Sequence, residues 1–129
     1  YVYSNTRFVP VPWISPVLMI KQQIESATGN TFNSVLLNYY RDGQDAMGWH
    51  SDDEKELGKQ PVIASLSLGG ERRFLLQRKD KTEKSIALHL QHGSLLLMQG
   101  VTQKNFQHAL PRSTKQIPAR INLTFRNIL

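Results

Sequence analysis

The stretch R-I-N-L-T-F-R, residues 120–126, alternates strictly between polar and apolar side chains. Successive side chains of a β-strand point to opposite faces of a sheet, so the pattern predicts a strand. One face carries Ile121, Leu123 and Phe125 and is expected to pack against a core. The other face carries two arginines, an amide and a hydroxyl group, from Arg120, Asn122, Thr124 and Arg126. Whether this polar face meets solvent or a ligand decides what the strand does.

Spacing and turn residues predict the other elements. Apolar residues from Val17 to Ala27 recur at helical spacing and stop at Gly29-Asn30, which predicts an amphipathic helix. Trp13, beside a proline-flanked turn, is expected to anchor packing. Strands are predicted between turn residues, at 34–40, 62–68, 73–77, 85–90 and 94–98, with a charged turn at 79–84. One helix ahead of many short strands is typical of a sandwich or jelly-roll barrel, and such barrels often hold a ligand.

Length and composition narrow the class of protein. The chain has 129 residues, 40% of them apolar, which suits one compact domain. It contains no cysteine, which excludes disulfides and thiolate metal sites. The net charge of +6 is compatible with a nucleic-acid partner and equally with ordinary solubility charge. No charged-then-apolar leader and no long apolar run is present, so we expect an intracellular protein that does not enter a membrane.

A possible metal site begins at W-H-S-D-D-E, where His50 and Asp52 are two residues apart. On an extended segment the two side chains share a face, and a third ligand from another strand would complete the two-histidine, one-carboxylate triad of non-haem iron(II) oxygenases. A bare H-x-D is also common in solvated turns. Spacing alone leaves the third ligand open among His89, His92 and His108.

The two arginines of the opening stretch support a ligand. Arg120 and Arg126 are separated by roughly 20 Å on an extended strand. Leaning inward, their side chains would leave a gap about the length of a small dicarboxylic acid, and guanidinium groups bind carboxylates in bidentate fashion. 2-Oxoglutarate is such an acid. A strand whose polar face meets only solvent is the alternative.

Four stretches together resemble the AlkB family of iron(II)- and 2-oxoglutarate-dependent nucleic-acid dealkylases, most closely its eukaryotic nuclear DNA-repair members. They are N-Y-Y-R-D-G-Q-D-A-M-G-W-H-S-D-D-E, H-G-S-L-L-L-M, Q-H-A-L-P and P-A-R-I-N-L-T-F-R. The resemblance implies a mainly β fold, a double-stranded β-helix (jelly roll) with an N-terminal helix packed on it. It also implies that residues 1–129 form one catalytic core, which we expect to lack an upstream segment because relatives carry one before the position of Tyr1.

The resemblance also implies roles for individual residues. The iron ligands and catalytic residues would be His50, Asp52 and His108. The 2-oxoglutarate contacts would be Asn38, Tyr40, Arg120, Asn122 and Arg126. The methylated base would meet Tyr1, Tyr3, Ser4 and Glu54. The nucleic-acid backbone would meet Arg72, Lys79, Lys81, Arg112 and Lys115. For these last two groups a frayed end, a surface acid and a solvated charge run are the competing interpretations.

The implied activity is oxidative demethylation of 1-methyladenine and 3-methylcytosine in DNA. The reaction uses iron(II), O2 and 2-oxoglutarate and releases succinate, carbon dioxide and formaldehyde. The same chemistry on RNA or on a protein side chain is one alternative, and a nucleic-acid-binding module with an inactive metal site is another. We expect a monomer that prefers single-stranded substrate, because relatives carry a base-stack wedge upstream, and that works in the nucleus of a eukaryote or the cytoplasm of a bacterium.

Overall fold

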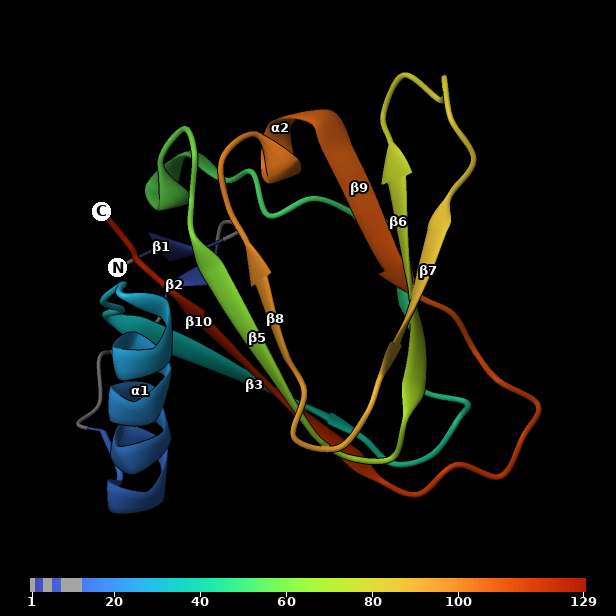
Figure 1. Cartoon of the computed structure of the whole chain (residues 1–129), viewed down its shortest axis with the longest axis horizontal. Helices are drawn as coiled ribbons and strands as arrows, with labels where there is room; N and C mark the ends of the chain where they lie inside the picture. The colour runs from blue at the N-terminus through green and yellow to red at the C-terminus, as the bar shows by residue number, and fades with distance from the viewer. Residues whose placement is uncertain (1, 4–5, 8–12) are drawn as a thin grey trace.

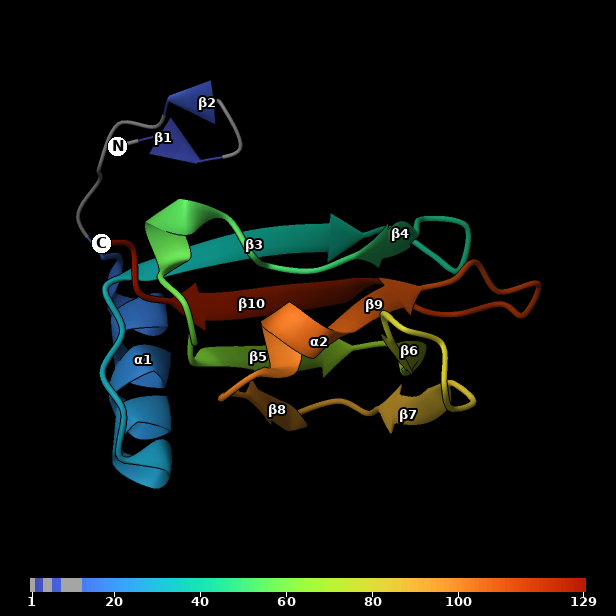
Figure 2. The ribbon, with the colours of Figure 1, turned by 90° about the horizontal axis from the view of Figure 1, so that it is seen from above.

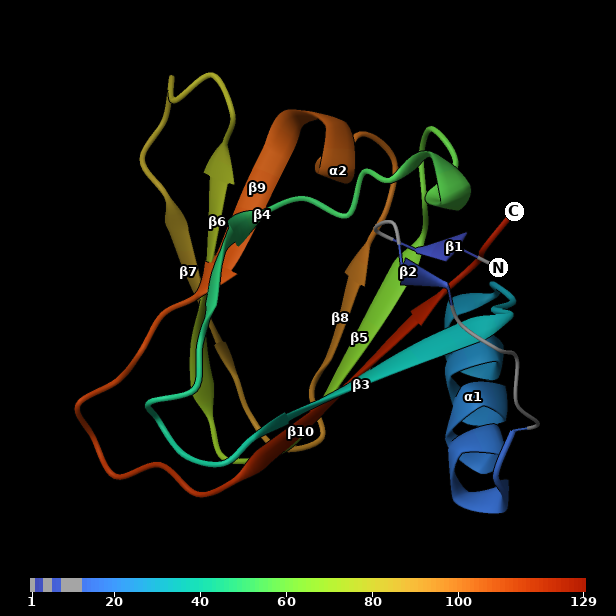
Figure 3. The same ribbon diagram turned by 180° about the vertical axis from the view of Figure 1, so that it is seen from behind.

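The computed structural model describes residues 2–3, 6–7 and 13–129, and its core is a pair of four-stranded antiparallel sheets (Figure 1). The first sheet has the order β3 (Ser34–Tyr40), β10 (Arg120–Arg126), β5 (Ile63–Gly69), β8 (Leu95–Met98). The second has the order β4 (Met47–His50), β9 (Phe106–Leu110), β6 (Arg72–Arg78), β7 (Ile86–Leu90). In Figures 1 and 3 the two sheets approach each other at one end and diverge at the other.

The chain passes repeatedly from one sheet to the other. β3 is followed by β4, β5 by β6, β7 by β8 and β9 by β10, and each of these steps changes sheet. This alternation between two facing antiparallel sheets is the topology of a jelly roll. The predicted fold class, a mainly β jelly roll with one helix ahead of it, is therefore confirmed.

Helix α1 (Ser15–Thr28) covers the outer face of the first sheet and runs across its strands (Figure 2). It begins with a proline in its first turn and ends at Gly29, whose φ of 71° places it in the left-handed region that glycine adopts without strain. Val17 and Ile24 on its buried face pack with Leu123 and Phe125. The helix predicted over 17–27 is confirmed.

Trp13 joins the same core cluster. Its ring stacks on Phe125 with centroids 6.3 Å apart and an interplanar angle of 8°. Nζ of Lys21 lies over the Trp13 ring, 5.5 Å from its centroid. Large aromatic side chains contribute much of the apolar area buried in a small core. The expectation that Trp13 anchors packing is confirmed.

The two faces of β10 separate the core from the inter-sheet space. Leu123 and Phe125 face α1 and are almost fully buried, whereas Ile121 on the same face is half-exposed because the helix does not cover it. Between the sheets a second apolar cluster forms, made of Tyr40, Ile63, Phe74, Leu90, Met98 and Leu110. The polar face of β10 also looks into this space, which answers the question raised by its sequence.

The five remaining predicted strands correspond to β3, β5, β6, β7 and β8, with ends shifted by no more than one residue. The charged segment after β6 forms the turn to β7. Strands β4 and β9 and the short helices η1 (Lys55–Leu57) and α2 (Thr102–Asn105) were not predicted. A small separate sheet pairs β1 (Val2–Tyr3) with β2 (Thr6–Arg7). Among the described residues, no helix is both long and apolar enough to cross a bilayer.

One glycine pair fixes the position of β10. Gly69 ends β5 and Gly70 begins the turn to β6, and the backbone of Ala119 and Pro118 lies so close that a side chain at either glycine would collide with it. Gly69 also has a φ of 96°, which an L side chain rarely adopts. The turn is thereby held against the residues that lead into Arg120.

Candidate active site

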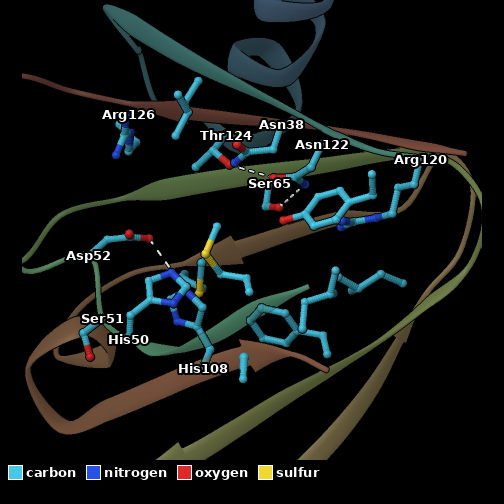
Figure 4. A pocket seen from close by; sticks show the side chains of 18 of the residues that line it. Asn38, His50, Ser51, Asp52, Ser65, His108, Arg120, Asn122, Thr124 and Arg126 are labelled. Carbon is cyan, nitrogen blue, oxygen red and sulfur yellow. Dashed lines mark hydrogen bonds and ion pairs between the residues drawn. The ribbon is translucent and has the colours of Figure 1, made fainter. Parts of the chain in front are cut away.

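Two histidines from neighbouring strands face each other in the second sheet. β4 runs antiparallel to β9, and its last residue, His50, pairs with His108. Asp52 follows two residues later, where the chain has left the strand. One ligand atom from each of the three residues lies within 4.8 Å of the other two, and their side chains point into the same space (Figure 4). The fold thus gathers two imidazoles and one carboxylate into a compact cluster.

Local contacts hold the two imidazole rings in place. Nδ1 of His50 lies 2.7 Å from the carbonyl oxygen of Gly48. A carbonyl oxygen only accepts, so Nδ1 is the donor of this bond and Nε2 is the nitrogen left for a metal, as in most histidines that bind one. The His108 ring meets the His50 ring edge-on at 4.3 Å and stacks on Phe74 at 5.3 Å between centroids.

Burial shifts the pKa values of two residues of the cluster, His108 and Asp52. Burial, reinforced by repulsion from His50, lowers the pKa of His108 to about 4, so its imidazole is neutral at pH 7. Burial also raises the pKa of Asp52, although His50 and Arg126 oppose the rise. The 3.8 Å contact between Asp52 and His108 is therefore not a strong ion pair. A dication would stabilise the charged carboxylate and use the free lone pair of the neutral imidazole.

The other two histidines lie outside the cluster. His89 is exposed, with its Nδ1 3.8 Å from a carboxylate oxygen of Glu71. His92 is in the turn between β7 and β8, and its Nδ1 accepts the backbone N–H of Gly69 at 2.8 Å. Of the three histidines that spacing left open, only His108 shares the space of His50 and Asp52. The donor set and its burial fit the two-histidine, one-carboxylate arrangement that iron(II) oxygenases use.

Arg120 is a buried cation on the opposite wall. It is only 3% exposed, and its Nη2 donates to Oγ of Ser67 at 2.9 Å. Its guanidinium lies over the Tyr40 ring at 5.0 Å, and its Nε has no hydrogen-bond partner among the described residues. Burial lowers the pKa of Arg120, which means that the site destabilises its charge. A carboxylate arriving from a ligand would supply both the missing acceptor and the missing charge.

The rest of the polar face of β10 forms a hydrogen-bonded wall. Asn122 donates to Oγ of Ser65 at 2.7 Å and to the carbonyl oxygen of Leu66 at 3.1 Å. Thr124 donates to the amide oxygen of Asn122 at 2.8 Å. Arg126, at the far end of the strand, is almost completely buried, and its charge favours the ionised form of Asp52. The wall thus has a cation at each end and neutral polar groups between them.

The triad and the β10 wall line one cavity of about 420 Å³. In Figure 4 the polar side chains of β10 lie across this cavity from the triad. Residues from both sheets contribute, and the members expected from the sequence are Asn38, Tyr40, His50, Asp52, Glu54, His108, Arg120, Asn122 and Arg126. A cavity of this size, with a few polar groups pointing into an apolar lining, is typical of small-ligand sites.

The residues expected to meet the base are described only in part. Glu54 lines the cavity beside the triad and is half-buried. Tyr1 and Ser4 lie outside the described residues. Tyr3 is described only as part of the backbone of β1.

One residue expected to contact nucleic-acid phosphates is elsewhere. Arg72 is 1% exposed, and its guanidinium donates to the carbonyl oxygens of Asp42, Asp45 and Pro111. It also stacks on the Tyr40 ring at 5.6 Å. The prediction that Arg72 contacts a phosphate was wrong, because an arginine with these partners ties two loops together from the inside.

The other four basic residues are on the surface. Lys79 lies 3.6 Å from Asp53, and Lys81 is in the turn that follows β6. Arg112 donates from Nε to the carbonyl oxygen of Gln44 at 3.2 Å, and Lys115 is exposed in the loop before β10. Their cationic ends are therefore accessible to solvent.

Two buried polar side chains of the site were not predicted. Ser67 holds Arg120, and its position two residues after Ser65 in the alternating A-S-L-S-L-G would have placed both serines on the cavity face. Gln103 accepts the backbone N–H of Asp52 at 2.8 Å. Nothing in the polar sequence T-Q-K-N distinguishes this glutamine from a surface loop residue.

A jelly roll that brings two histidines and a carboxylate opposite a buried arginine defines the class of 2-oxoglutarate- and iron(II)-dependent oxygenases. In agreement, the sequence matches the 2OG-Fe(II) oxygenase superfamily over residues 1–126. It is 43% identical over 137 residues to rat "Alpha-ketoglutarate-dependent dioxygenase alkB homolog 3" (Rattus norvegicus), covering 99% of this chain and 46% of the relative. It is also 43% identical over 136 residues to human "DNA oxidative demethylase ALKBH2" (Homo sapiens), covering 100% and 52%.

The chain belongs to the AlkB family of this superfamily. It spans about half the length of the relatives named above. The solved structure titled "The structure of OsALKBH1" has the same fold, with a TM-score of 0.64 over 89% of this chain and 66% of that one, at 24% sequence identity.

Proposed function

We propose that this chain is the catalytic core, in a single domain, of an enzyme that oxidatively demethylates nucleic-acid bases. The observation that carries the proposal is the arrangement in one cavity of the His50–Asp52–His108 cluster and the buried Arg120 opposite it. The relatives named as DNA oxidative demethylase and as alpha-ketoglutarate-dependent dioxygenase support the same activity. Adenine methylated at N1 and cytosine methylated at N3, in DNA, are the proposed substrates.

In this proposal the triad holds iron(II) and the β10 wall holds 2-oxoglutarate. Nε2 of His50, one carboxylate oxygen of Asp52 and Nε2 of His108 are the ligand atoms. Arg120, oriented by Ser67, binds the distal carboxylate. The other four contacts to the co-substrate come from residues that line the same cavity, which are Asn38, Tyr40, Asn122 and Arg126.

Iron(II) held by the triad would supply, with O2 and 2-oxoglutarate, the oxidation that turns the methyl group into formaldehyde and 2-oxoglutarate into succinate and carbon dioxide. The chain itself supplies orientation and exclusion of water. Phe74, Leu90, Met98 and Leu110 line the cavity around the triad and keep it apolar. Neutral His108 and buried Arg120 are both held in place before a ligand arrives, so little reorganisation accompanies binding.

The methylated base must leave the base stack to reach the cavity. Glu54 is proposed to accept a hydrogen bond from the exocyclic amino group of adenine or cytosine, because it lines the cavity close to Asp52. Tyr1, Tyr3 and Ser4 are proposed to form the rest of the base-binding surface. Lys79, Lys81, Arg112 and Lys115 are proposed to meet phosphates around it.

The test is turnover by the protein with iron(II), 2-oxoglutarate and O2. Formaldehyde is measured with oligonucleotides that carry 3-methylcytosine, as DNA and as RNA of the same sequence, and with a methylated peptide. The proposal expects release from the DNA, dependent on 2-oxoglutarate, and loss of release in His108→Ala with retention in His89→Ala. Formaldehyde release from the peptide alone would reject the proposal. The absence of succinate formation with all of these substrates would also reject it.

A further inference from the structure

Gln103 is a buried polar side chain next to the proposed metal site. It lies on α2, is 2% exposed and is not among the residues that line the cavity. Its Oε1 accepts the backbone N–H of Asp52 at 2.8 Å, and its Nε2 donates toward Sδ of Met98 at 3.5 Å. A glutamine buried this deeply is normally retained for its hydrogen bonds, because burying an amide without them is costly.

The orientation of the Gln103 amide follows from its partners. A backbone N–H can only donate, so the side-chain oxygen must face Asp52. The NH2 group then faces Met98, whose thioether sulfur is a weak acceptor. Both ends of the amide are thus occupied, and the strong bond is the one to Asp52. The main stabilising interaction of the Gln103 side chain is therefore its hydrogen bond to the backbone of Asp52, a proposed iron ligand.

The segment that carries Asp52 needs such support. β4 ends at His50, so the ladder to β9 no longer holds the chain when it reaches Asp52. The preceding residue, Ser51, donates from Oγ to the carbonyl oxygen of Phe106 at 2.5 Å. Side-chain bonds to the α2–β9 segment thus continue where backbone pairing stops. They tie Asp52 to the segment that carries His108.

We infer that Gln103 is a positioning residue, which fixes the backbone of Asp52 so that its carboxylate points at the same place as Nε2 of His50 and His108. This inference rests on the proposed metal site. It adds a residue to that site which touches neither metal nor substrate. Partners that orient metal ligands typically contribute 10- to 100-fold to metal affinity.

The test measures divalent-metal binding without turnover. Mn(II) is titrated into the metal-free protein, and the free ion is counted from its electron paramagnetic resonance signal. Gln103→Leu keeps a similar volume but leaves the buried N–H of Asp52 without an acceptor, and is expected to weaken Mn(II) binding about tenfold. Gln107→Leu is the matched control, because Gln107 is a partly buried glutamine on the same segment whose side chain bonds to Gln77 and not to Asp52. It should bind Mn(II) like the parent.

A second substitution separates positioning from packing. Gln103→Glu keeps an oxygen at the same reach, and an added carboxylate near a dication favours binding. Its Mn(II) affinity should remain within about threefold of the parent. If Gln103→Leu does not fold, as judged by thermal unfolding of the metal-free protein, Gln103→Asn takes its place, because it is shorter by one methylene and cannot reach Asp52.

The outcomes distinguish this inference from the proposed function. Parent-like binding by Gln103→Leu or Gln103→Asn, with the parent binding Mn(II), overturns the role of Gln103 and leaves the metal site intact. An equal loss in Gln103→Glu and Gln103→Leu also overturns it, since the acceptor would not be what matters. Failure of the parent itself to bind Mn(II) rejects the metal site and the inference together.

Discussion

Oδ2 of Asp52 lies 3.8 Å from Nε2 of His108, although the two residues come from distant parts of the chain. They are 9% and 6% exposed, and burial disfavours the charged form of each, although His50 and Arg126 partly offset this for Asp52. Two such groups in contact, with a second imidazole beside them, are poorly explained by stability alone. They are well explained by a cation that binds between them.

The first prediction concerns the identity of the ligands. His108→Ala should abolish turnover and weaken Mn(II) or iron(II) binding by at least tenfold, because it removes one of three ligands. His89→Ala and His92→Ala should do neither, since both rings lie outside the cluster. Metal affinity by titration and formaldehyde release are measured on all three variants. A variant at His92 that loses metal while the variant at His108 keeps it would reverse the assignment.

The second prediction concerns Arg120. Replacing it by alanine would remove the proposed charge-assisted pair with the co-substrate, which costs about 2–5 kcal/mol. The 2-oxoglutarate requirement should therefore rise by an order of magnitude or more, while Mn(II) affinity stays near that of the parent. Arg41→Ala is the control, because Arg41 is a highly exposed arginine paired with Asp45. An unchanged requirement in Arg120→Ala would show that the polar face of β10 does not hold the co-substrate.

The third prediction concerns acid sensitivity of the metal-free protein. Burial and then repulsion from His50 lower the pKa of His108 from 6.5 to about 4, so between these values the unfolded chain binds the proton and the folded chain does not. The free energy of unfolding should therefore fall as the pH drops from about 6.5 to about 4, by at most about 3 kcal/mol from this residue. Asp52 opposes the trend, because its raised pKa makes the folded chain the better proton binder.

Urea unfolding at several pH values between 7 and 4 measures this effect. His108→Leu should show a flatter decline than the parent, and His89→Leu should follow the parent because His89 is exposed. Parallel curves for the parent and His108→Leu would mean that the imidazole of His108 titrates normally in the folded protein.

The fourth prediction concerns the surface cations. Neutralising Lys79, Lys81, Arg112 and Lys115 together should flatten the dependence of oligonucleotide affinity on salt, because each phosphate contact releases counterions. Arg72 is left unchanged, since its guanidinium is buried. Affinity is measured across a range of salt concentrations, with Arg41→Gln as a control, because Arg41 is an exposed cation outside both the turn after β6 and the loop before β10. A slope that is the same in the parent and the fourfold variant would place the phosphates elsewhere.

The parts of the fold that the sequence predicted share a simple cause. β10 is seven residues long and alternates strictly between polar and apolar side chains, so its sequence predicts a strand clearly. β4 and β9 are shorter, and they carry the metal-binding candidates on their inner faces, where an apolar residue would otherwise lie. A strand whose inward-facing residues are histidines lacks the alternation of polar and apolar residues by which strands are recognised.

The parts of the site that were missed depend on contacts between distant residues. Arg72 reads as one of a run of surface cations in E-R-R-F, and only the positions of two loops show that three carbonyl oxygens surround it. Gln103 likewise gains its meaning from Asp52, which follows another strand. Composition and spacing describe a residue and its neighbours in the chain, whereas a buried hydrogen bond is a property of the assembled sheets.

The alternation of polar and apolar side chains in β10 also determines what a one-residue error in its pairing would do to the fold. A shift of its pairing by one residue would turn Arg120 and Arg126 toward α1 and Leu123 and Phe125 toward the cavity. Such a chain would lose its core under the helix and the β10 wall of the cavity in the same step. A one-residue slip of β10 therefore cannot give a chain that keeps the core under α1 and lacks only the polar face of the cavity.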